Sequence, residues 1–252
     1  MKIVVSLKVV SDDQDIQVAG DGSLDFSKAH RVVSPYDLNA MEAAAQMAAA
    51  AAESCVIGMT VGAAAINDSK LKKNILARGI DELYMTADDA CADLDSHATA
   101  EALAALVAQI GDFDVIVCGD GSADNYAQQV DVQLAAKLDL PIVTAVTKIT
   151  LHDDFLEVER LLEDVVETVS VPMPAILTVS PDSAVPRIPG MKDILAAGKK
   201  PLKVVAAQDC FAATVETLSC TAPKQTDRKL KMFDASEDGA LESFAAAIKA
   251  AL

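Results

Sequence analysis

Short apolar runs rich in β-branched residues alternate with alanine-rich stretches through the first half of this chain, and this alternation restricts the fold more than any other feature. Strands are predicted at residues 3–7, 55–61, 82–85 and 115–118, and helices at 37–52, 67–78 and 99–110. Strands that alternate with helices form βαβ units, in which the strands are parallel. The sequence therefore predicts an α/β fold with a doubly wound, mostly parallel sheet.

Two of these runs mark the middle of the predicted sheet. The residues around Ile3 and around Val115 are continuously apolar rather than alternately apolar and polar. Strands that are covered by helices on both faces have this pattern. We therefore expect both runs to be central strands.

The pattern changes after Pro141, where three strand-like runs follow one another without a helix between them. They are predicted at residues 143–151, 155–161 and 165–171, with a turn at 152–154. Because consecutive strands joined by short turns pair in an antiparallel manner, we expect an antiparallel extension of the sheet. A separate excursion at residues 12–33 is expected to contain a turn at 19–23 between two short extended pieces.

The C-terminal part is predicted to form a loop, a short helix, an arm and a terminal helix. Three prolines within residues 181–189 exclude a regular helix or central strand, and a helix is expected at 191–197. Residues 208–232 are polar and weakly periodic, but apolar residues then recur at helical spacing, at Leu241, Phe244, Ala245 and Ile248. A structureless stretch of about 25 residues is unusual inside a compact domain. We therefore expect one domain at 1–204, and an arm with an amphipathic helix at 205–252 that packs on another subunit.

Charge and composition exclude several classes of function. The formal net charge of −17 opposes binding to nucleic acid by long-range repulsion. No apolar stretch approaches the roughly 18 residues of a membrane span, and there is no signal-peptide core, so we expect a cytoplasmic protein that is not itself a membrane protein. The five cysteines include no CxxC pair and the three histidines are dispersed. We therefore predict no metal-ligating and no catalytic residues.

The most informative local feature is a glycine loop, Cys118-Gly119-Asp120-Gly121-Ser122-Ala123-Asp124-Asn125, predicted to lie where a strand ends and a helix begins. Backbone N–H groups and the helix dipole favour an anion at such a turn, and glycine lets a phosphate approach the backbone. Ligands of open α/β sheets also bind at the carboxyl ends of strands. The alternative is a structural turn in which Asp124 caps the helix. Asp120 would oppose a neighbouring phosphate unless it points away or bonds a ribose hydroxyl.

Five separated motifs resemble one known family. They are Val5-Ser6-Leu7-Lys8, Ser34-Pro35-Tyr36-Asp37-Leu38-Asn39-Ala40, the glycine loop, the stretch from Val158 through Glu163-Asp164 and Glu167-Thr168-Val169 to Pro174-Ala175-Ile176-Leu177-Thr178, and Pro186-Arg187 with Lys199-Lys200-Pro201. In this order they resemble electron-transfer flavoprotein β subunits over residue 1 to about 204. The second and third motifs are most similar to the FixA branch.

The resemblance implies a fold like the adenine-nucleotide α-hydrolase group and a buried adenine nucleotide in this subunit, either AMP or, as in electron-bifurcating members, a second FAD. It also implies an FAD-holding α subunit as partner. The heterodimer would carry electrons from an acyl-CoA-type or other dehydrogenase to a membrane or soluble acceptor oxidoreductase. The implied nucleotide-binding residues are Ser6, Ser34, Pro35, Tyr36, Asp37 and Val61, with Gly119, Asp120, Gly121, Ser122, Ala123, Asp124, Asn125, Tyr126, Ala127, Gln128, Gln129 and Val130.

The same resemblance implies a partner-recognition loop at residues 181–204, in which Pro186, Arg187 and Met191 dock on partner proteins. Prolines stiffen such a loop and lower the ordering cost of docking, and a flexible thioether fills varied pockets. The alternative for Met191 is that it packs under the helix that follows.

Two other functions are compatible with the predicted fold. The first is a stand-alone adenine-nucleotide-binding regulatory protein, which would be monomeric and colourless and would bind its nucleotide reversibly. The second is an ATP-cleaving adenylating enzyme. That enzyme should need a pyrophosphate loop and magnesium ligands near the N-terminus, and neither is evident at residues 6–13.

Overall fold

The computed structural model describes residues 1–208, 211–224 and 230–251. These residues form two compact units. The first unit comprises Met1–Gln17 and Asp25–Ser219, and the second comprises Val18–Leu24 and Cys220–Leu252.

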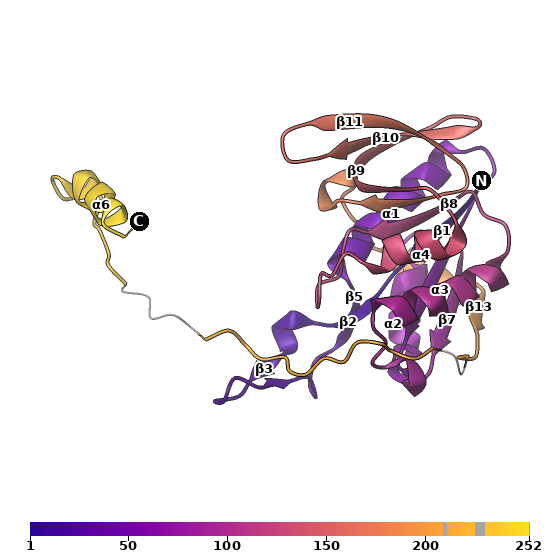
Figure 1. Cartoon of the computed structure of the whole chain (residues 1–252), viewed down its shortest axis with the longest axis horizontal. Helices are drawn as coiled ribbons and strands as arrows, with labels where there is room; N and C mark the ends of the chain where they lie inside the picture. Colours follow the sequence, from indigo (N-terminus) through magenta and orange to yellow (C-terminus); the bar gives the residue numbers. More distant parts are fainter. Residues whose placement is uncertain (209–210, 225–229, 252) are drawn as a thin grey trace. The chain divides into compact units, whose positions relative to one another are not determined.

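A nine-stranded sheet is the centre of the first unit (Figure 1). Its spatial order is β11-β10-β9-β12-β8-β1-β6-β7-β13. The strands are β1 (Lys2–Ser6), β6 (Cys55–Gly62), β7 (Glu82–Ala87), β8 (Val115–Gly119), β9 (Ile142–Leu151), β10 (Phe155–Leu161), β11 (Val166–Pro172), β12 (Ala175–Val179) and β13 (Leu202–Val204). In this spatial order, every neighbouring pair from β9 to the β13 edge is parallel. At the other edge, β10 pairs antiparallel with both β9 and β11. The predicted fold class, the central places of β1 and β8 and the antiparallel extension are confirmed.

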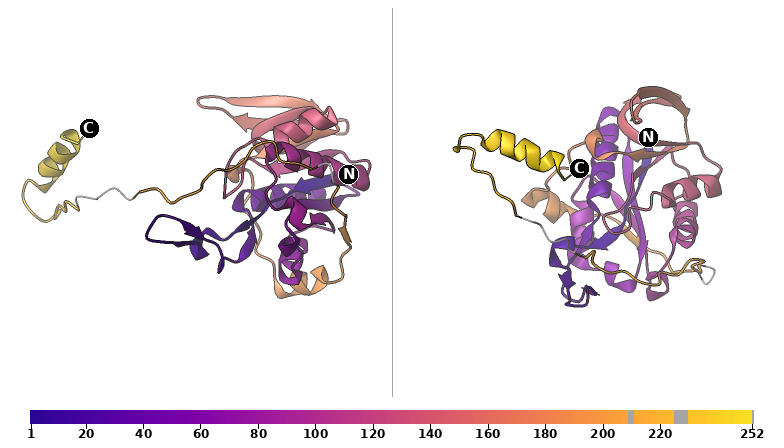
Figure 2. Two further views of the ribbon diagram at one scale, coloured as in Figure 1. Left: turned by 60° about the horizontal axis from the view of Figure 1, so that its bottom comes forward. Right: turned by 60° about the vertical axis from the view of Figure 1, so that its left-hand side comes forward.

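Helices cover both faces of this sheet (Figure 2). They are α1 (Pro35–Ala50), α2 (Ser69–Leu76), α3 (Ser96–Ile110), α4 (Val130–Leu138) and α5 (Met191–Ala197). Ile3 and Val5 of β1 point into one apolar cluster with α1 and α2, and Val4 between them points into the other with α3 and α4. This alternation follows from the two-residue period of a strand. Because both faces of β1 are covered, Ile3, Val4 and Val5 are all buried. The doubly wound arrangement therefore rests on two separate hydrophobic cores.

Two strands of the sheet were not expected from the sequence. β12 lies between β8 and β9 and is buried along its whole length, and β13 forms the edge beside β7. Only Met173 and Pro174 separate β12 from β11. No helix lies between the two strands, and the apolar residues of β12 do not alternate with polar ones, so the sequence did not mark β12 as a separate strand.

Smaller elements flank the sheet. β2 (Val9–Ser11) pairs antiparallel with β5 (Arg31–Val33), and β3 (Gln17–Val18) pairs with β4 (Leu24–Asp25). The expected turn at 19–23 is present, closed by a hydrogen bond from Ala19 N to Ser23 O of 2.9 Å. Short 3₁₀ turns occur at Asp13–Asp15, Ala64–Ile66, Asp89–Cys91 and Pro181–Ser183.

The second unit contains the expected terminal helix, α6 (Ala240–Lys249). None of its residues is buried, and the apolar side chains of Leu241, Phe244 and Ile248 are exposed. The unit also contains an isolated bridge between Ser23 and Thr221. Among the residues that the structure describes, no helix has the length and apolar character to cross a membrane.

Candidate functional site

The sheet order reverses between β1 and β8. From β1 the chain adds β6 and then β7 on one side, and it then returns to add β8 on the other side of β1. Such a switch leaves a crevice outside the carboxyl ends of the two strands, where ligands of open α/β sheets bind. Ser6 ends β1 and Gly119 ends β8, and Val61 lies near the end of the adjacent β6. Three of the predicted site positions therefore meet at this edge.

Asp37, in the first turn of α1, ties the two strand ends together. Its Oδ2 accepts a hydrogen bond of 2.7 Å from the backbone N–H of Lys8, and its Oδ1 accepts one of 3.3 Å from that of Gly119. The side chain is buried, and this burial raises the pKa of Asp37 to about 7, although both hydrogen bonds act in the opposite direction. The bonds position α1 against the switch point.

The glycine loop is held to α1 by a second contact. Ser34 is completely buried at the start of α1, and its hydroxyl accepts a hydrogen bond of 3.3 Å from the N–H of Ala123. The adjacent ion pair between Lys8 Nζ and Asp124 Oδ2 spans 2.6 Å, and Ser122 Oγ donates to Asp124 Oδ1 at 2.5 Å. The loop is therefore attached both to α1 and to the residue that follows β1.

The proposed helix cap at Asp124 is wrong. α4 begins only at Val130, with Gln129 as its N-cap residue, so ten loop residues separate β8 from the helix. Asp124 instead pairs with Lys8. The N–H groups at the start of α4 are consequently not those of the glycines, and the helix dipole acts at the far end of the loop from Gly119.

Tyr126 lies over the middle of the loop. A Cβ atom added to Gly121 would stand 2.3 Å from the Tyr126 ring, so the ring covers the backbone of this glycine. The Tyr126 hydroxyl donates to Asp120 Oδ2 at 3.0 Å, and its ring centroid is 5.0 Å from that of Tyr36. Burial, followed by the contact with Asp120, raises the pKa of Tyr126 and keeps this hydroxyl a donor.

The rest of the loop is exposed and locally bonded. Asn125 N donates to Asp124 Oδ1 at 2.8 Å, and Ser96 Oγ donates to Gln129 Oε1 at 2.9 Å, which links the loop to the start of α3. Ala127 and Gln128 are exposed, and Gln128 has a left-handed φ of 53°.

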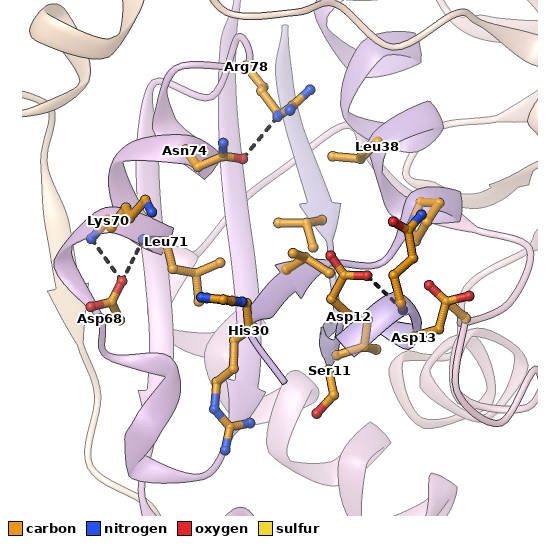
Figure 3. A pocket seen from close by; sticks show the side chains of 17 residues that line it. Ser11, Asp12, Asp13, His30, Leu38, Asp68, Lys70, Leu71, Asn74 and Arg78 are labelled. Atoms are coloured by element: carbon orange, nitrogen blue, oxygen red, sulfur yellow. Dashed lines mark hydrogen bonds between the residues drawn. The ribbon is translucent and has the colours of Figure 1, made fainter. Parts of the chain in front are cut away.

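A cleft of 780 Å³ adjoins the site, between the β2–β5 ribbon, the start of α1 and α2 (Figure 3). Pro35 and Ala123 are the only predicted nucleotide-binding residues among its lining residues. Its walls combine apolar side chains with both signs of charge: Val10, Val32, Val33, Leu38 and Leu71, with Asp12, Asp13, Asp68, His30, Arg31, Lys70 and Arg78.

The proposed docking loop does not line this cleft but is bonded to Arg78, one of the wall residues. Arg187 forms two side-chain hydrogen bonds with the buried carboxylate of Glu42 on α1, at 2.6 and 3.1 Å, and Arg78 donates to the Arg187 carbonyl at 2.7 Å. Met191, the first residue of α5, is 76% exposed. Met191 therefore does not pack under the following helix, and Pro186 lies next to the anchored residue.

Two residues at these positions were not predicted from the sequence as functional. Lys8 donates its backbone N–H to Asp37 and forms an ion pair with Asp124 through its side chain. Glu42 accepts hydrogen bonds from the Arg187 side chain and so holds it in place. A lysine directly after a central strand in so acidic a chain was the available signal for Lys8. Glu42 gave none, because an acidic residue inside a helix is ordinarily exposed. Within the described residues, no three His, Cys, Asp or Glu side chains gather in a way that could hold a metal ion.

A comparison with family models matches residues 22–210 of this chain to the electron transfer flavoprotein domain. The matched range contains α1, the glycine loop and the docking loop.

Proposed function

The chain belongs to the electron transfer flavoprotein family, and on this premise we propose that it is the β subunit of such a flavoprotein. It binds an adenine nucleotide and pairs with an α subunit that holds FAD. The bound flavin supplies the redox chemistry. This chain supplies the nucleotide site, part of the subunit interface and a surface for the electron donor.

The observation that carries the proposal is the convergence at the β1–β8 switch point. Ser34 before α1, Asp37 in its first turn and the glycine loop after β8 meet there through hydrogen bonds of 2.7 to 3.3 Å. The proposed nucleotide site consists of these residues with Ser6, Val61 and the loop as far as Val130. Asp37 and Ser34 support it by positioning the loop, because their side chains are already hydrogen-bonded within the chain.

The identity of the nucleotide is AMP or a second FAD. The fit of the residues to a nucleotide rests on Asp120, whose Oδ1 is buried and has no hydrogen-bond partner among the described residues. A second FAD would need space beyond the mononucleotide, and the cleft that begins at Pro35 and Ala123 supports that reading. With AMP alone this cleft would stay unfilled.

The proposed interaction with electron donors uses Met191 and its apolar neighbours. Val185, Ile188 and Leu195 are also strongly exposed, and Arg187 anchors the segment that carries them. A dehydrogenase of the acyl-CoA type or another class would dock there, and a membrane or soluble oxidoreductase would accept the electrons.

Co-expression with an α subunit tests the function directly. We expect a one-to-one heterodimer that releases one FAD and one AMP on denaturation, or two FAD molecules if the second nucleotide is a flavin. Chromatography of the released nucleotides, with flavin measured by its visible absorbance and AMP by its ultraviolet absorbance, gives the count. A monomeric, colourless chain that exchanges its nucleotide freely would instead favour the regulatory alternative. A chain that binds no adenine nucleotide in either form would contradict the proposal.

A further inference from the structure

Tyr126 covers the side of Gly121 on which other residues carry a Cβ atom. The 2.3 Å separation between its ring and a Cβ at position 121 leaves no space for a ligand atom on that side of the backbone. A glycine loop binds phosphate through close approach to its backbone. A ligand bound on that side of Gly121 must therefore displace the ring.

The Tyr126 hydroxyl also uses one of the two acceptor oxygens of the Asp120 carboxylate. It donates to Oδ2 at 3.0 Å, in the manner of a sugar hydroxyl, while the buried Oδ1 has no partner. Buried carboxylate oxygens are normally hydrogen-bonded. Asp120 can thus accept another donor, and a ribose with two adjacent hydroxyls supplies two.

The backbone supports a movable tyrosine. Tyr126 has a φ of 45° and Gln128 a φ of 53°, both in the left-handed region that residues other than glycine adopt only at a cost. Tyr126 is 44% exposed. Its ring contacts Asp120 and Tyr36, whereas its backbone N–H is bonded to Ser122 O and the flanking loop is held at Asp124 and Gln129. The ring can turn outward about its side-chain torsions without breaking the core, because Tyr126 belongs to neither apolar cluster.

We propose that Tyr126 is an internal competitor of the nucleotide, whose ring covers Gly121 and whose hydroxyl holds the place of a ribose hydroxyl on Asp120. This inference rests on the proposed nucleotide site and assigns the ribose contact within it. Binding exchanges the tyrosine hydroxyl for the ribose, so Asp120 selects ribonucleotides over deoxynucleotides.

Tyr126→Phe tests the exchange, because it keeps the ring and removes only the competing donor. In the nucleotide-depleted full chain, titration calorimetry should show AMP binding about three- to tenfold more tightly than in the wild type, since one hydrogen bond of the free state is no longer lost. Tyr84→Phe is the matched control, because it also removes a hydrogen-bonded tyrosine hydroxyl, one that contacts Lys203 on a distant edge. We expect no change there.

Asp120→Asn and 2′,3′-dideoxy-AMP locate the effect. The Asn variant should bind AMP more weakly, and the gain from Tyr126→Phe should shrink in the Asn background. With 2′,3′-dideoxy-AMP the wild type should bind more weakly than with AMP, and this difference should be smaller in Asp120→Asn. Equal AMP affinity of the wild type and Tyr126→Phe would overturn the inference while leaving the nucleotide site intact, and so would equal affinity of the wild type for AMP and dideoxy-AMP. Failure of the wild type to bind either AMP or FAD would overturn the site and the inference together.

Discussion

The two central glycines of the loop are required for different reasons. A Cβ on Gly119 would lie 2.7 Å from Asp37 Oδ1 and 2.8 Å from the Tyr36 backbone, whereas the three atoms nearest to a Cβ on Gly121 all belong to the Tyr126 ring. Backbone and a buried carboxylate cannot move aside, but a half-exposed ring can. Position 119 is therefore a packing constraint, and position 121 is a constraint on the ligand and on Tyr126.

We accordingly expect Gly119→Ala to lower the free energy of unfolding by about 1 to 3 kcal/mol, the usual cost of overpacking a buried position. Gly121→Ala is the matched variant and should change stability by less than about 0.5 kcal/mol while reducing nucleotide content. Urea unfolding and nucleotide release measure the two effects. Equal destabilisation by both substitutions would mean that the Tyr126 ring is as immovable as the backbone.

Asp37 makes stability depend on pH. Its pKa is raised from 3.8 to about 7 in the folded state, so the folded protein holds this proton more tightly than the unfolded chain does. The free energy of unfolding therefore falls through this group as pH rises from 3.8 to about 7, and the effect is complete above that range.

Asp37→Asn removes this titration. Between pH 5 and pH 8 the variant should gain about 1 to 3 kcal/mol relative to the wild type, because each pH unit contributes at most about 1.4 kcal/mol. Urea unfolding at both pH values measures the difference, with Asp153→Asn in an exposed turn as control. A relative loss for the variant at pH 8 would show that the Lys8 and Gly119 N–H groups outweigh burial.

At the scale of elements, the sequence pattern predicted those helices and strands whose ends are marked by residues that break regular structure. The helix at Met191–Ala197 and the strand at Phe155–Leu161 have the predicted bounds, because prolines and a polar turn delimit them. β12 was missed because a buried parallel strand has no alternation to mark it, and α4 was placed too early because polar loop residues resemble a helix start.

The prediction of the site residues depended more on the resemblance to the flavoprotein family than on any local sequence pattern. The glycine loop alone could not be distinguished from a structural turn. The contacts that organise it join residues far apart in sequence, such as Asp37 with Gly119 and Ser34 with Ala123. Such pairings follow from the sheet order, which no local motif contains. The covering of Gly121 by Tyr126 depends further on a left-handed backbone that the sequence does not indicate.

The docking loop is held by the Arg187–Glu42 ion pair, together with hydrogen bonds from Arg78 to the Arg187 carbonyl and from Asn39 to the Ala184 carbonyl. Glu42 has a side chain only 9% exposed, whereas that of Arg187 is 42% exposed. Burial raises the pKa of Glu42, but hydrogen bonds from Arg187 and Gln46 outweigh this effect and the pKa is lowered. Removal of Arg187 would leave a mostly buried carboxylate without its cation.

Arg187→Met should therefore lower the free energy of unfolding by about 1 to 2 kcal/mol, which is less than the cost of breaking a fully buried ion pair because the Arg187 side chain is partly exposed. The substitution should also weaken docking, because it displaces Met191. Arg160→Met, which breaks a more exposed pair with Glu167, should cost about 0 to 0.5 kcal/mol. Glu42→Gln combined with Arg187→Met should recover most of the stability but not the docking. Unchanged docking in both variants would separate the loop from partner recognition.

At the scale of the whole molecule, the two units differ in how they are stabilised. The first unit has two buried cores, whereas α6 in the second unit buries none of its residues. The chain up to Ser219 includes an anchored piece, because Asp95 accepts hydrogen bonds from Thr214 and Val215. We propose that the segment after Ser219 is stabilised by the α subunit instead.

Deletion of residues 220–252 tests this proposal more sharply than deletion of the whole predicted arm and helix at 205–252, because it keeps the contacts at Asp95. The truncated chain should keep its melting temperature within a few degrees but should not co-purify with the α subunit. Leu241, Phe244 and Ile248 lie on one face of α6, and burial of each would contribute roughly 1.5 to 3 kcal/mol to association. Their replacement by serine in the full chain should therefore weaken association nearly as much as the deletion, whereas Glu242→Ser on the same helix should not. If the truncated chain still forms a one-to-one complex with the α subunit, the terminal helix is not part of the interface.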